Sequence, residues 1–434
     1  MPVTLDSTAS DFEAAFTTLL NAKREDSPDV DVVVADIISD VCSRGDAAVI
    51  DLTAKFDRLT LTPDTLRITE AEIDAALAEA PQAELDALNL AADRIAAYHA
   101  RQLPVDESWT DDTGATLGWR WTPVSAAGLY VPGGLASYPS SVLMNAVPAK
   151  VAGVPRLAMV VPTPDGILNP LVLAAARLAG VDEIYRIGGA QAVAALAYGT
   201  QSIAAVDKIT GPGNAYVAAA KRRVFGKVGI DMIAGPSEIL VIADADNDPD
   251  WIALDLLSQA EHDESAQSIL ITTDAAFGRA VAKAVDKRLE TLARRAIAGA
   301  SWRDNGAIIT VPDLAAAAQL SNRIAPEHLE LCVDDPDALS AQITHAGAIF
   351  LGQWTPEAIG DYVGGPNHVL PTARSARFSS GLSVLDFMKR TTLAKMTPEA
   401  LRAIGPAAET LAQSESLEAH GLSVTARLSK LNRS

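Results

Sequence analysis

Hydrophobic and polar positions give the first part of the chain a helical pattern. Apolar residues recur every three to four positions in segments 11–24, 30–57 and 70–102. This spacing predicts amphipathic helices. Residues 110–121, "TDDTGATLGWRW", interrupt the pattern with small and aromatic residues around a glycine, and they predict a β-hairpin.

From about residue 130 onward, short runs rich in β-branched residues alternate with alanine-rich helical runs. Residues 156–164 ("RLAMVVPTP"), 183–189 ("EIYRIGG") and 206–213 ("VDKITGPG") each precede such a helical run. Strands that alternate with helices typically form βαβ units, so the pattern predicts an α/β fold with largely parallel sheets. After residue 372 the pattern changes to short helices.

Length and charge narrow the class of protein. A chain of 434 residues is long enough for two or three domains. Its formal net charge of -20 argues against a nucleic-acid-binding face, which needs basic side chains to meet phosphates. Two cysteines, Cys42 and Cys332, cannot form a disulfide framework or a cysteine-rich zinc site.

The uncharged stretches do not have the pattern of membrane spans. Residues 123–149 are interrupted by prolines and a double glycine, and residues 187–206 contain glutamines after a Gly-Gly pair. The first sixteen residues lack a basic segment followed by an apolar one, so no secretory signal is expected. These features predict a cytoplasmic protein.

Glycine-rich turns follow several predicted strands. Gly188 and Gly189 lie in "RIGGAQAV", Gly211 and Gly213 lie in "TGPGNAYV", and "AGLYVPGG" adds an aromatic residue, Tyr130. A glycine-rich strand-to-helix junction can offer backbone N–H groups to a phosphate. Neither of the first two turns matches the full dinucleotide fingerprint, so tight turns and a nucleotide site both remain open.

The stretch "LLSQAEHDESAQSIL" ends a predicted helix with a cluster of polar residues. Asp248 followed by Pro249 is a good helix start. A helix from there to His262 places Gln259 and His262 three residues apart, on one face. The pair is either half of a metal site or an ordinary polar helix end.

The remaining candidates are histidines beside carboxylates. Glu327 and His328 adjoin in "IAPEHLEL", where they are either a surface pair or two groups acting on one substrate. Cys332, four residues later, would be a nucleophile only if it were activated, and its apolar surroundings favour a buried core cysteine. Asp361 and His368 form a further pair in "IGDYVGGPNHVLPT". Glu415 and His420 form another in "SESLEAHGLSV". His99 and His345 lie in alanine-rich helical contexts and are expected to be structural.

The chemistry-bearing segments, taken in order, closely resemble the histidinol dehydrogenase family from about residue 20 to the C-terminus. One such motif is weakly specific, whereas the ordered set is highly specific. The segments are "LYVPGG", "GGAQAVAALAYGT", "ITGPGNAYV", "GPSEILVIAD", "LLSQAEHD", "APEHLEL", "GDYVGGPNHVLPT" and "EAHGLS".

The resemblance implies an NAD-dependent, zinc-dependent homodimer that oxidises L-histidinol to L-histidine through bound L-histidinaldehyde, with two NAD per histidinol. It also implies two incomplete Rossmann-like domains with parallel sheets, N-terminal helices and a small helical C-terminal tail. The expected divisions are an N-terminal helical region (1–120), an NAD-binding domain (121–240), a second Rossmann-like domain with the metal and catalytic residues (241–380), and a dimerisation tail (381–434).

The resemblance also assigns roles to residues at matching positions. Glu327 and His328 would be the acid/base pair. One zinc ion per subunit would be held by Gln259, His262, Asp361 and His420, with the tail reaching the partner's site. Tyr130, Gln191 and Asn214 would contact NAD. The substrate would meet the zinc ligands and His328, together with Ser237, His368 and Glu415.

Three rival functions are weighed against this one. A related dehydrogenase for another small polar alcohol is disfavoured by the presence of both His368 and Glu415. A zinc hydrolase with Glu327 activating water would not need the repeated glycine-rich turns. A non-enzymatic binding protein is the third rival.

Overall fold

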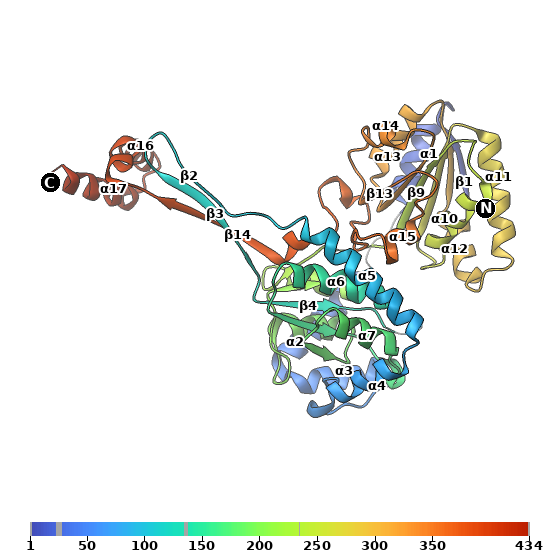
Figure 1. Cartoon of the computed structure of the whole chain (residues 1–434), viewed down its shortest axis with the longest axis horizontal. Coiled ribbons are helices and arrows are strands. Elements are labelled where there is room, and N and C mark those ends of the chain that lie inside the picture. The colour runs from blue at the N-terminus through green and yellow to red at the C-terminus, as the bar shows by residue number, and fades with distance from the viewer. Residues whose placement is uncertain (1, 23–27, 134–137, 234, 433–434) are drawn as a thin grey trace. The chain divides into compact units, whose positions relative to one another are not determined.

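The computed structural model describes residues 2–22, 28–133, 138–233 and 235–432. The chain forms two compact units, each made from separated segments. Unit 1 contains residues 1–102 and 125–387, and unit 2 contains residues 103–124 and 388–434. Unit 1 holds two parallel sheets, and unit 2 holds a small antiparallel sheet with two helices (Figure 1).

The first sheet of unit 1 has five parallel strands in the order β6-β5-β4-β7-β8. Its central strand β4 is buried along its whole length, which explains its uninterrupted apolar sequence. The strands are β4 (Ala126–Tyr130), β5 (Arg156–Val160), β6 (Glu183–Tyr185), β7 (Lys208–Thr210) and β8 (Gly229–Ile230).

Helices cover this sheet in two groups. Apolar residues of α2 (Pro28–Arg44), α3 (Asp46–Asp57), α8 (Gly189–Tyr198) and α9 (Ala215–Val224) share one core cluster with the sheet. The second group packs as α4 on α7, α7 on α6 and α6 on α5. Its members are α4 (Glu70–Glu79), α5 (Gln82–Ala100), α6 (Pro139–Val151) and α7 (Pro170–Leu178), and the short helices η1 (Pro63–Thr65) and η2 (Pro164–Gly166) lie in loops.

The second sheet of unit 1 has six parallel strands in the order β1-β11-β10-β9-β12-β13. Strand β1, the first strand of the chain, therefore lies at one edge of this sheet, beside β11. The strands are β1 (Val3–Asp6), β9 (Glu238–Ala243), β10 (Gln267–Thr272), β11 (Ala307–Thr310), β12 (His328–Cys332) and β13 (Ala348–Leu351).

Alternate residues of these strands point to opposite helical layers. Leu240 and Ile242 pack with α1 and α13, whereas Ile239 and Val241 pack with α10, α11 and α12. The helices are α1 (Phe12–Asn21), α10 (Pro249–Ala260), α11 (Ala275–Leu289), α12 (Arg295–Asn305), α13 (Leu314–Ile324), α14 (Pro336–Ser340) and α15 (Glu357–Tyr362), followed by η3 (Ser375–Arg377) and η4 (Val384–Phe387).

The two sheets share one topology. Counted along the chain, β4 to β8 and β9 to β13 both have the strand order 3-2-1-4-5, and β1 is added to the edge of the second sheet. This is the order of the dinucleotide-binding fold without its sixth strand. The predicted α/β class with two incomplete Rossmann-like domains is therefore confirmed.

Unit 2 is built from the predicted hairpin and the end of the chain. Strands β2 (Glu107–Thr110) and β3 (Thr116–Pro123) are antiparallel, which confirms the hairpin, and β14 (Met388–Lys395) pairs with β3 along its full length. Helices α16 (Pro398–Ser414) and α17 (Glu418–Leu431) pack side by side (Figure 1). The tail is thus a strand followed by two helices.

Strands β1 and β14 were not predicted. Strand β1, "VTLD", alternates apolar and polar residues but only over four positions, and β14, "MKRTTLAK", is mostly polar and exposed and carries no alternation. Residues 23 and 24 of the first predicted helix and Gly134 of the "LYVPGG" turn lie outside the described residues. Among the residues described, no helix is both long enough and apolar enough to span a bilayer.

Candidate active site

Glu327 and His328 lie where β12 begins, and the neighbouring strand β9 holds both of them. The backbone N–H of Glu238 donates to Oε2 of Glu327 at 2.9 Å. Nδ1 of His328 lies 3.0 Å from the carbonyl oxygen of Glu238, which can only accept, so Nδ1 carries the proton. One residue at the start of β9 therefore fixes both side chains of the pair.

The same contact determines which nitrogen of His328 is free. A neutral imidazole with its proton on Nδ1 has a lone pair on Nε2. Nε2 is buried and has no hydrogen-bond partner among the described residues. Burial lowers the pKa of His328, because it penalises the charged ring. The ring is thus a buried proton acceptor at Nε2.

Helix α15 and the loop after it bring Asp361 and His368 to this imidazole. Oδ1 of Asp361 lies 3.9 Å from Nε2 of His328 and 3.8 Å from Nδ1 of His368. His368 donates through Nδ1 to the carbonyl oxygen of Asp361 at 3.0 Å, and its Nε2 is 3.5 Å from Oγ of Ser141 on α6. Burial lowers the pKa of His368 as well.

Gln259 and His262 lie at the carboxyl end of α10. As the sequence predicts, the Asp248 side chain caps this helix by accepting from the N–H of Asp250, and Pro249 is its first residue. Nε2 of Gln259 lies 3.2 Å from Nδ1 of His262, so the two side chains share one face. Oε1 of Gln259 is buried and has no hydrogen-bond partner in the described chain.

These groups suit a zinc ion. An amide oxygen without a partner, a carboxylate and imidazole nitrogens are the mixed donors that zinc accepts. Burial is the main cause that lowers the pKa of His328 and of His368, and the charge of Asp361 opposes it. The charge of His262 lowers both pKa values further, so the three imidazole rings lie near one another. Ligand atoms of His328, Glu357 and Asp361 lie within 4.8 Å of one another.

Glu357 was missed by the sequence reasoning. It is the first residue of α15, and its Oε1 lies 3.2 Å from Nδ1 of His328. Burial, reinforced by the charges of Asp361 and Glu330, raises the pKa of Glu357 well above its usual value. Its position four residues before Asp361, on the same helix face, was the available signal.

Two more carboxyls, the buried Glu330 and the half-buried Asp255, are linked to Glu357. The backbone N–H of Glu357 donates to Oε1 of Glu330 at 2.6 Å, and Glu330 is hydrogen-bonded to Asp255 of α10. Burial raises the pKa of Asp255 to about 6 and raises that of Glu330 further. A glutamate inside the apolar run "HLELC" was the signal, because residues two apart on a strand share a face with His328.

The three predicted cofactor residues meet at the carboxyl edge of the first sheet. Tyr130 ends β4, and its hydroxyl accepts from the N–H of Gly189 at 3.0 Å. Gln191, in the first turn of α8, is buried, and its Oε1 has no hydrogen-bond partner among the described residues. Asn214 is the N-cap of α9. Burial raises the pKa of Tyr130 to about 12, so its hydroxyl stays protonated.

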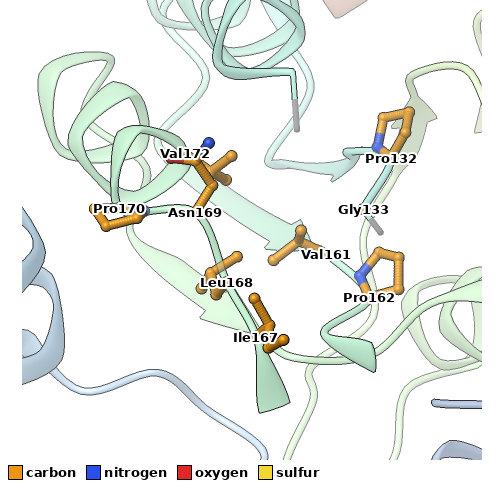
Figure 2. A pocket seen from close by; sticks show the side chains of 9 residues that line it. All are labelled: Pro132, Gly133, Val161, Pro162, Ile167, Leu168, Asn169, Pro170 and Val172. Atoms are coloured by element: carbon orange, nitrogen blue, oxygen red, sulfur yellow. The ribbon is translucent and has the colours of Figure 1, made fainter. Parts of the chain in front are cut away.

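A cavity of about 360 Å³ opens at the same edge, beyond the ends of β4 and β5. Figure 2 shows its mostly apolar lining. The lining residues are Pro132, Gly133, Val161, Pro162, Ile167, Leu168, Asn169, Pro170 and Val172. This edge therefore offers both glycine turns and an apolar surface.

Comparison with known proteins decides the family. The model of the histidinol dehydrogenase family matches residues 20–428. Histidinol dehydrogenase of Ruegeria pomeroyi is 79% identical over 100% of both chains, and that of Cereibacter sphaeroides is 75% identical, also over 100% of both. The crystal structure of histidinol dehydrogenase from Elizabethkingia anophelis has a TM-score of 0.94 at 37% identity and covers 99% of each chain. The chain belongs to the histidinol dehydrogenase family.

Membership in the histidinol dehydrogenase family confirms the predicted enzyme class, an NAD-dependent dehydrogenase of histidine biosynthesis. It also excludes the rival readings as a zinc hydrolase and as a non-enzymatic binding protein. The family implies NAD and zinc, and the clustered residues described above are compatible with both.

The other predicted substrate and metal residues lie at separate places. Ser237 directly precedes β9 and is half-buried. Glu415 and His420 belong to unit 2, between α16 and α17 and in the first turn of α17, and both side chains are exposed there. Unit 1 by itself therefore brings together three of the four zinc ligands that the histidinol dehydrogenase resemblance implies, namely Gln259, His262 and Asp361.

Cys332 ends β12 inside an apolar core cluster, as expected for a core cysteine. It is 4% exposed, and burial raises the pKa of its thiol well above the usual value. A buried thiol of this kind is a poor nucleophile.

Proposed function

We propose that this protein oxidises L-histidinol to L-histidine in two steps, each with one NAD, through bound L-histidinaldehyde. The observation that carries the proposal is the buried, unprotonated Nε2 of His328, which lies 3.9 Å from Oδ1 of Asp361, while Nδ1 of the same ring lies 3.7 Å from Glu327. An alcohol oxidation needs a base at the hydroxyl proton, and this nitrogen is available for that task. We also propose that the protein is located in the cytoplasm, as the sequence predicts.

One zinc ion per subunit is proposed to be held by Gln259, His262 and Asp361 together with His420 of the partner subunit. Bound there, zinc would supply positive charge that orients the substrate's polar groups. Gln259 supports this assignment because its buried Oε1 has no hydrogen-bond partner among the described residues. An unpaired buried acceptor destabilises a protein unless a ligand pairs with it.

His328 would accept the hydroxyl proton as a hydride leaves the substrate carbon for NAD. Its Nδ1 contact with the carbonyl oxygen of Glu238 keeps the ring oriented throughout. Glu327 would take a proton from the water that adds to the aldehyde. Its Oε2 already accepts one N–H, so the carboxylate is held at a fixed place beside the base. Burial of both side chains excludes bulk water and protects the aldehyde.

NAD is proposed to lie along the carboxyl edge of the first sheet, where Tyr130, Gln191 and Asn214 meet. Ligands of open α/β sheets bind outside the carboxyl ends of the strands, at the point where the strand order reverses. Here that point lies between β4 and β7, which Tyr130 and Asn214 flank. The cavity beside it, which mostly apolar side chains line (Figure 2), would suit a flat ring of the cofactor.

Substrate recognition is proposed for Ser237, His368 and Glu415 in addition to the metal ligands and His328. Glu415 and His420 are exposed on unit 2, where they are available to a second subunit. A homodimer whose tails complete each other's sites explains why both residues are placed on the tail.

The test measures NADH formed from a limiting amount of L-histidinol with the zinc-loaded protein and excess NAD. Two NADH per histidinol are expected, with L-histidine as the product. A yield of one, or none, contradicts the proposal. His328→Gln should lower kcat by roughly a hundredfold or more while zinc content is retained, because a positioned base contributes on that order.

Cys332→Ser, in the same strand, is the matched control for that variant. It should keep kcat close to the wild-type value, because the thiol lies in the apolar core. If Cys332→Ser lost turnover while the fold survived, a thiol mechanism would replace the one proposed.

A further inference from the structure

A buried ion pair lies beneath the turn that leads to Asn214. Lys221 is on α9, and Asp231 follows β8. Their side chains are 3% and 1% exposed, and the ammonium group contacts Oδ1 of the carboxylate. The predicted chemistry gives this pair no role.

Both members of the pair hold the same residue, Gly211, at the start of the turn. Nζ of Lys221 donates to the carbonyl oxygen of Gly211 at 2.9 Å. The N–H of Gly211 donates to Oδ2 of Asp231 at 2.7 Å, and Oδ1 of Asp231 accepts from the N–H of Met232 at 2.6 Å. The ion pair thus binds Gly211 through its N–H and its carbonyl.

Gly211 is also confined on its other side. Its φ is +111°, a conformation that favours glycine, and a Cβ atom there would lie 2.0 Å from the carbonyl oxygen of Tyr130. Tyr130 in turn accepts from Gly189. The turn before Asn214 is therefore fixed against the tyrosine that ends β4 and against the other glycine turn.

Stability alone is a weak reason for such a pair. Burying two charges costs desolvation that their attraction barely offsets, and apolar residues of similar volume often serve the fold as well. What apolar residues cannot supply is a donor and an acceptor aimed at the carbonyl and the N–H of one residue. The ion pair therefore supplies orientation of the Gly211–Asn214 backbone.

We propose that Lys221 and Asp231 are positioning residues for NAD, a role that rests on the function proposed above. They hold the Gly211 turn in its binding geometry before the cofactor arrives. A preformed site avoids the cost of ordering a loop on binding, so loss of the pair weakens NAD binding. Neither side chain needs to touch the cofactor.

The test compares Lys221→Met and Asp231→Asn with the wild type, all as zinc-loaded, full-length protein. The Kd for NAD from isothermal titration and the KM for NAD should rise about tenfold, which corresponds to about 1.4 kcal/mol. The kcat at saturating NAD, the Kd for L-histidinol and the zinc content should stay within about twofold of the wild type, since the pair acts on the cofactor turn alone.

A second lysine–aspartate pair in the same unit, with side chains 32% and 42% exposed, supplies a control for the loss of an ion pair as such. Lys150 and Asp182 are 3.0 Å apart, and Asp182 also accepts from the N–H of Leu157, but among the described residues neither side chain is hydrogen-bonded to the glycine turns before Gln191 and Asn214. Lys150→Met and Asp182→Asn should leave the Kd for NAD unchanged.

The proposal is overturned if folded Lys221→Met and Asp231→Asn bind NAD as the wild type does. It is also overturned if zinc and L-histidinol binding weaken as much as NAD binding. Should a single variant not fold, the uncharged pair Lys221→Met with Asp231→Leu is measured by the same criteria. A wild-type protein that forms no NADH contradicts the proposed function, whereas normal wild-type turnover with unaffected variants contradicts this inference alone.

Discussion

At the scale of residues, the second imidazole nitrogen distinguishes the structural His99 from the proposed base His328. Burial lowers the pKa of His99, His328 and His368 alike. In His99, Nδ1 donates to the carbonyl oxygen of Ile95 at 2.8 Å and Nε2 lies 3.5 Å from the amide nitrogen of Asn367. Both nitrogens of His99 therefore have a hydrogen-bond partner, as expected for a structural residue, whereas Nε2 of His328 has none among the described residues.

His99 predicts a pH dependence of stability. Its folded-state pKa is below the unfolded value of about 6.5. As the pH falls below that value, the unfolded chain takes up the proton first, so the free energy of unfolding decreases. His99→Gln removes this effect together with roughly 1–2 kcal/mol of hydrogen bonding and packing. The stability difference between wild type and variant should therefore be smaller at pH 5.5 than at pH 8 in urea unfolding. An unchanged difference would contradict this account.

At the scale of elements, the site depends on where helices and strands end. His328 and Glu238 begin strands β12 and β9, and Gln259 and His262 lie at or just beyond the end of α10, so the proposed catalytic and metal-binding groups gather at the amino edge of the second sheet. The cofactor residues lie at the carboxyl edge of the first sheet. Side-chain caps such as Asp248 on α10 and Asn214 on α9 define where the helices begin.

The cap of α10 allows stability to be separated from metal binding. Asp248→Ala removes the acceptor for the N–H of Asp250 at the amino end of the helix. The free energy of unfolding should fall by about 1 kcal/mol. Zinc content and kcat should not change, because Gln259 and His262 are at the other end. Thermal unfolding and metal analysis check both points, and loss of zinc would show that the whole helix depends on its cap.

At the scale of the molecule, one topology is used in two ways. Both sheets have the strand order 3-2-1-4-5, yet the first carries the proposed cofactor residues at its carboxyl edge and the second carries the proposed catalytic residues at its amino edge. Helix α6, which covers the first sheet, contacts the loop that follows α15. Ser141 of α6 lies 3.5 Å from His368, and the side chain of Asn367 donates to the carbonyl oxygen of Met144. His420 and Glu415 are on unit 2, which the chain enters twice.

A mixed dimer tests whether the tail serves a partner. His262→Asn disables the site in unit 1, and His420→Asn disables the tail, so each homodimer should be inactive. A heterodimer joins an intact unit 1 to an intact tail at one of its two sites. Random mixing by co-expression should therefore restore roughly a quarter of wild-type activity. No recovery in verified heterodimers would mean that each tail serves its own subunit.

The sequence by itself determined the class of the fold, the alternation of strands and helices from about residue 130 to 310, and the residues expected to do chemistry. Strand and helix periodicities are local properties of the chain, and glycine turns and caps such as Asp248 act within a few residues. The ordered motifs, from "LYVPGG" to "EAHGLS", were specific enough to identify the family.

Only the tertiary structure decided which nitrogen of His328 is free, which carboxyls are buried, and what holds the cofactor turn. Each of these depends on contacts between residues far apart in the sequence, such as Glu238 with His328 or Gly211 with Asp231. Lys221 and the exposed strand β14 carry no local pattern that marks their roles, and the spacing of Glu357 from Asp361 does not by itself show that Glu357 is buried beside His328. Burial and hydrogen-bond partners arise only when the chain has folded, and they set the proton positions on which the chemistry depends.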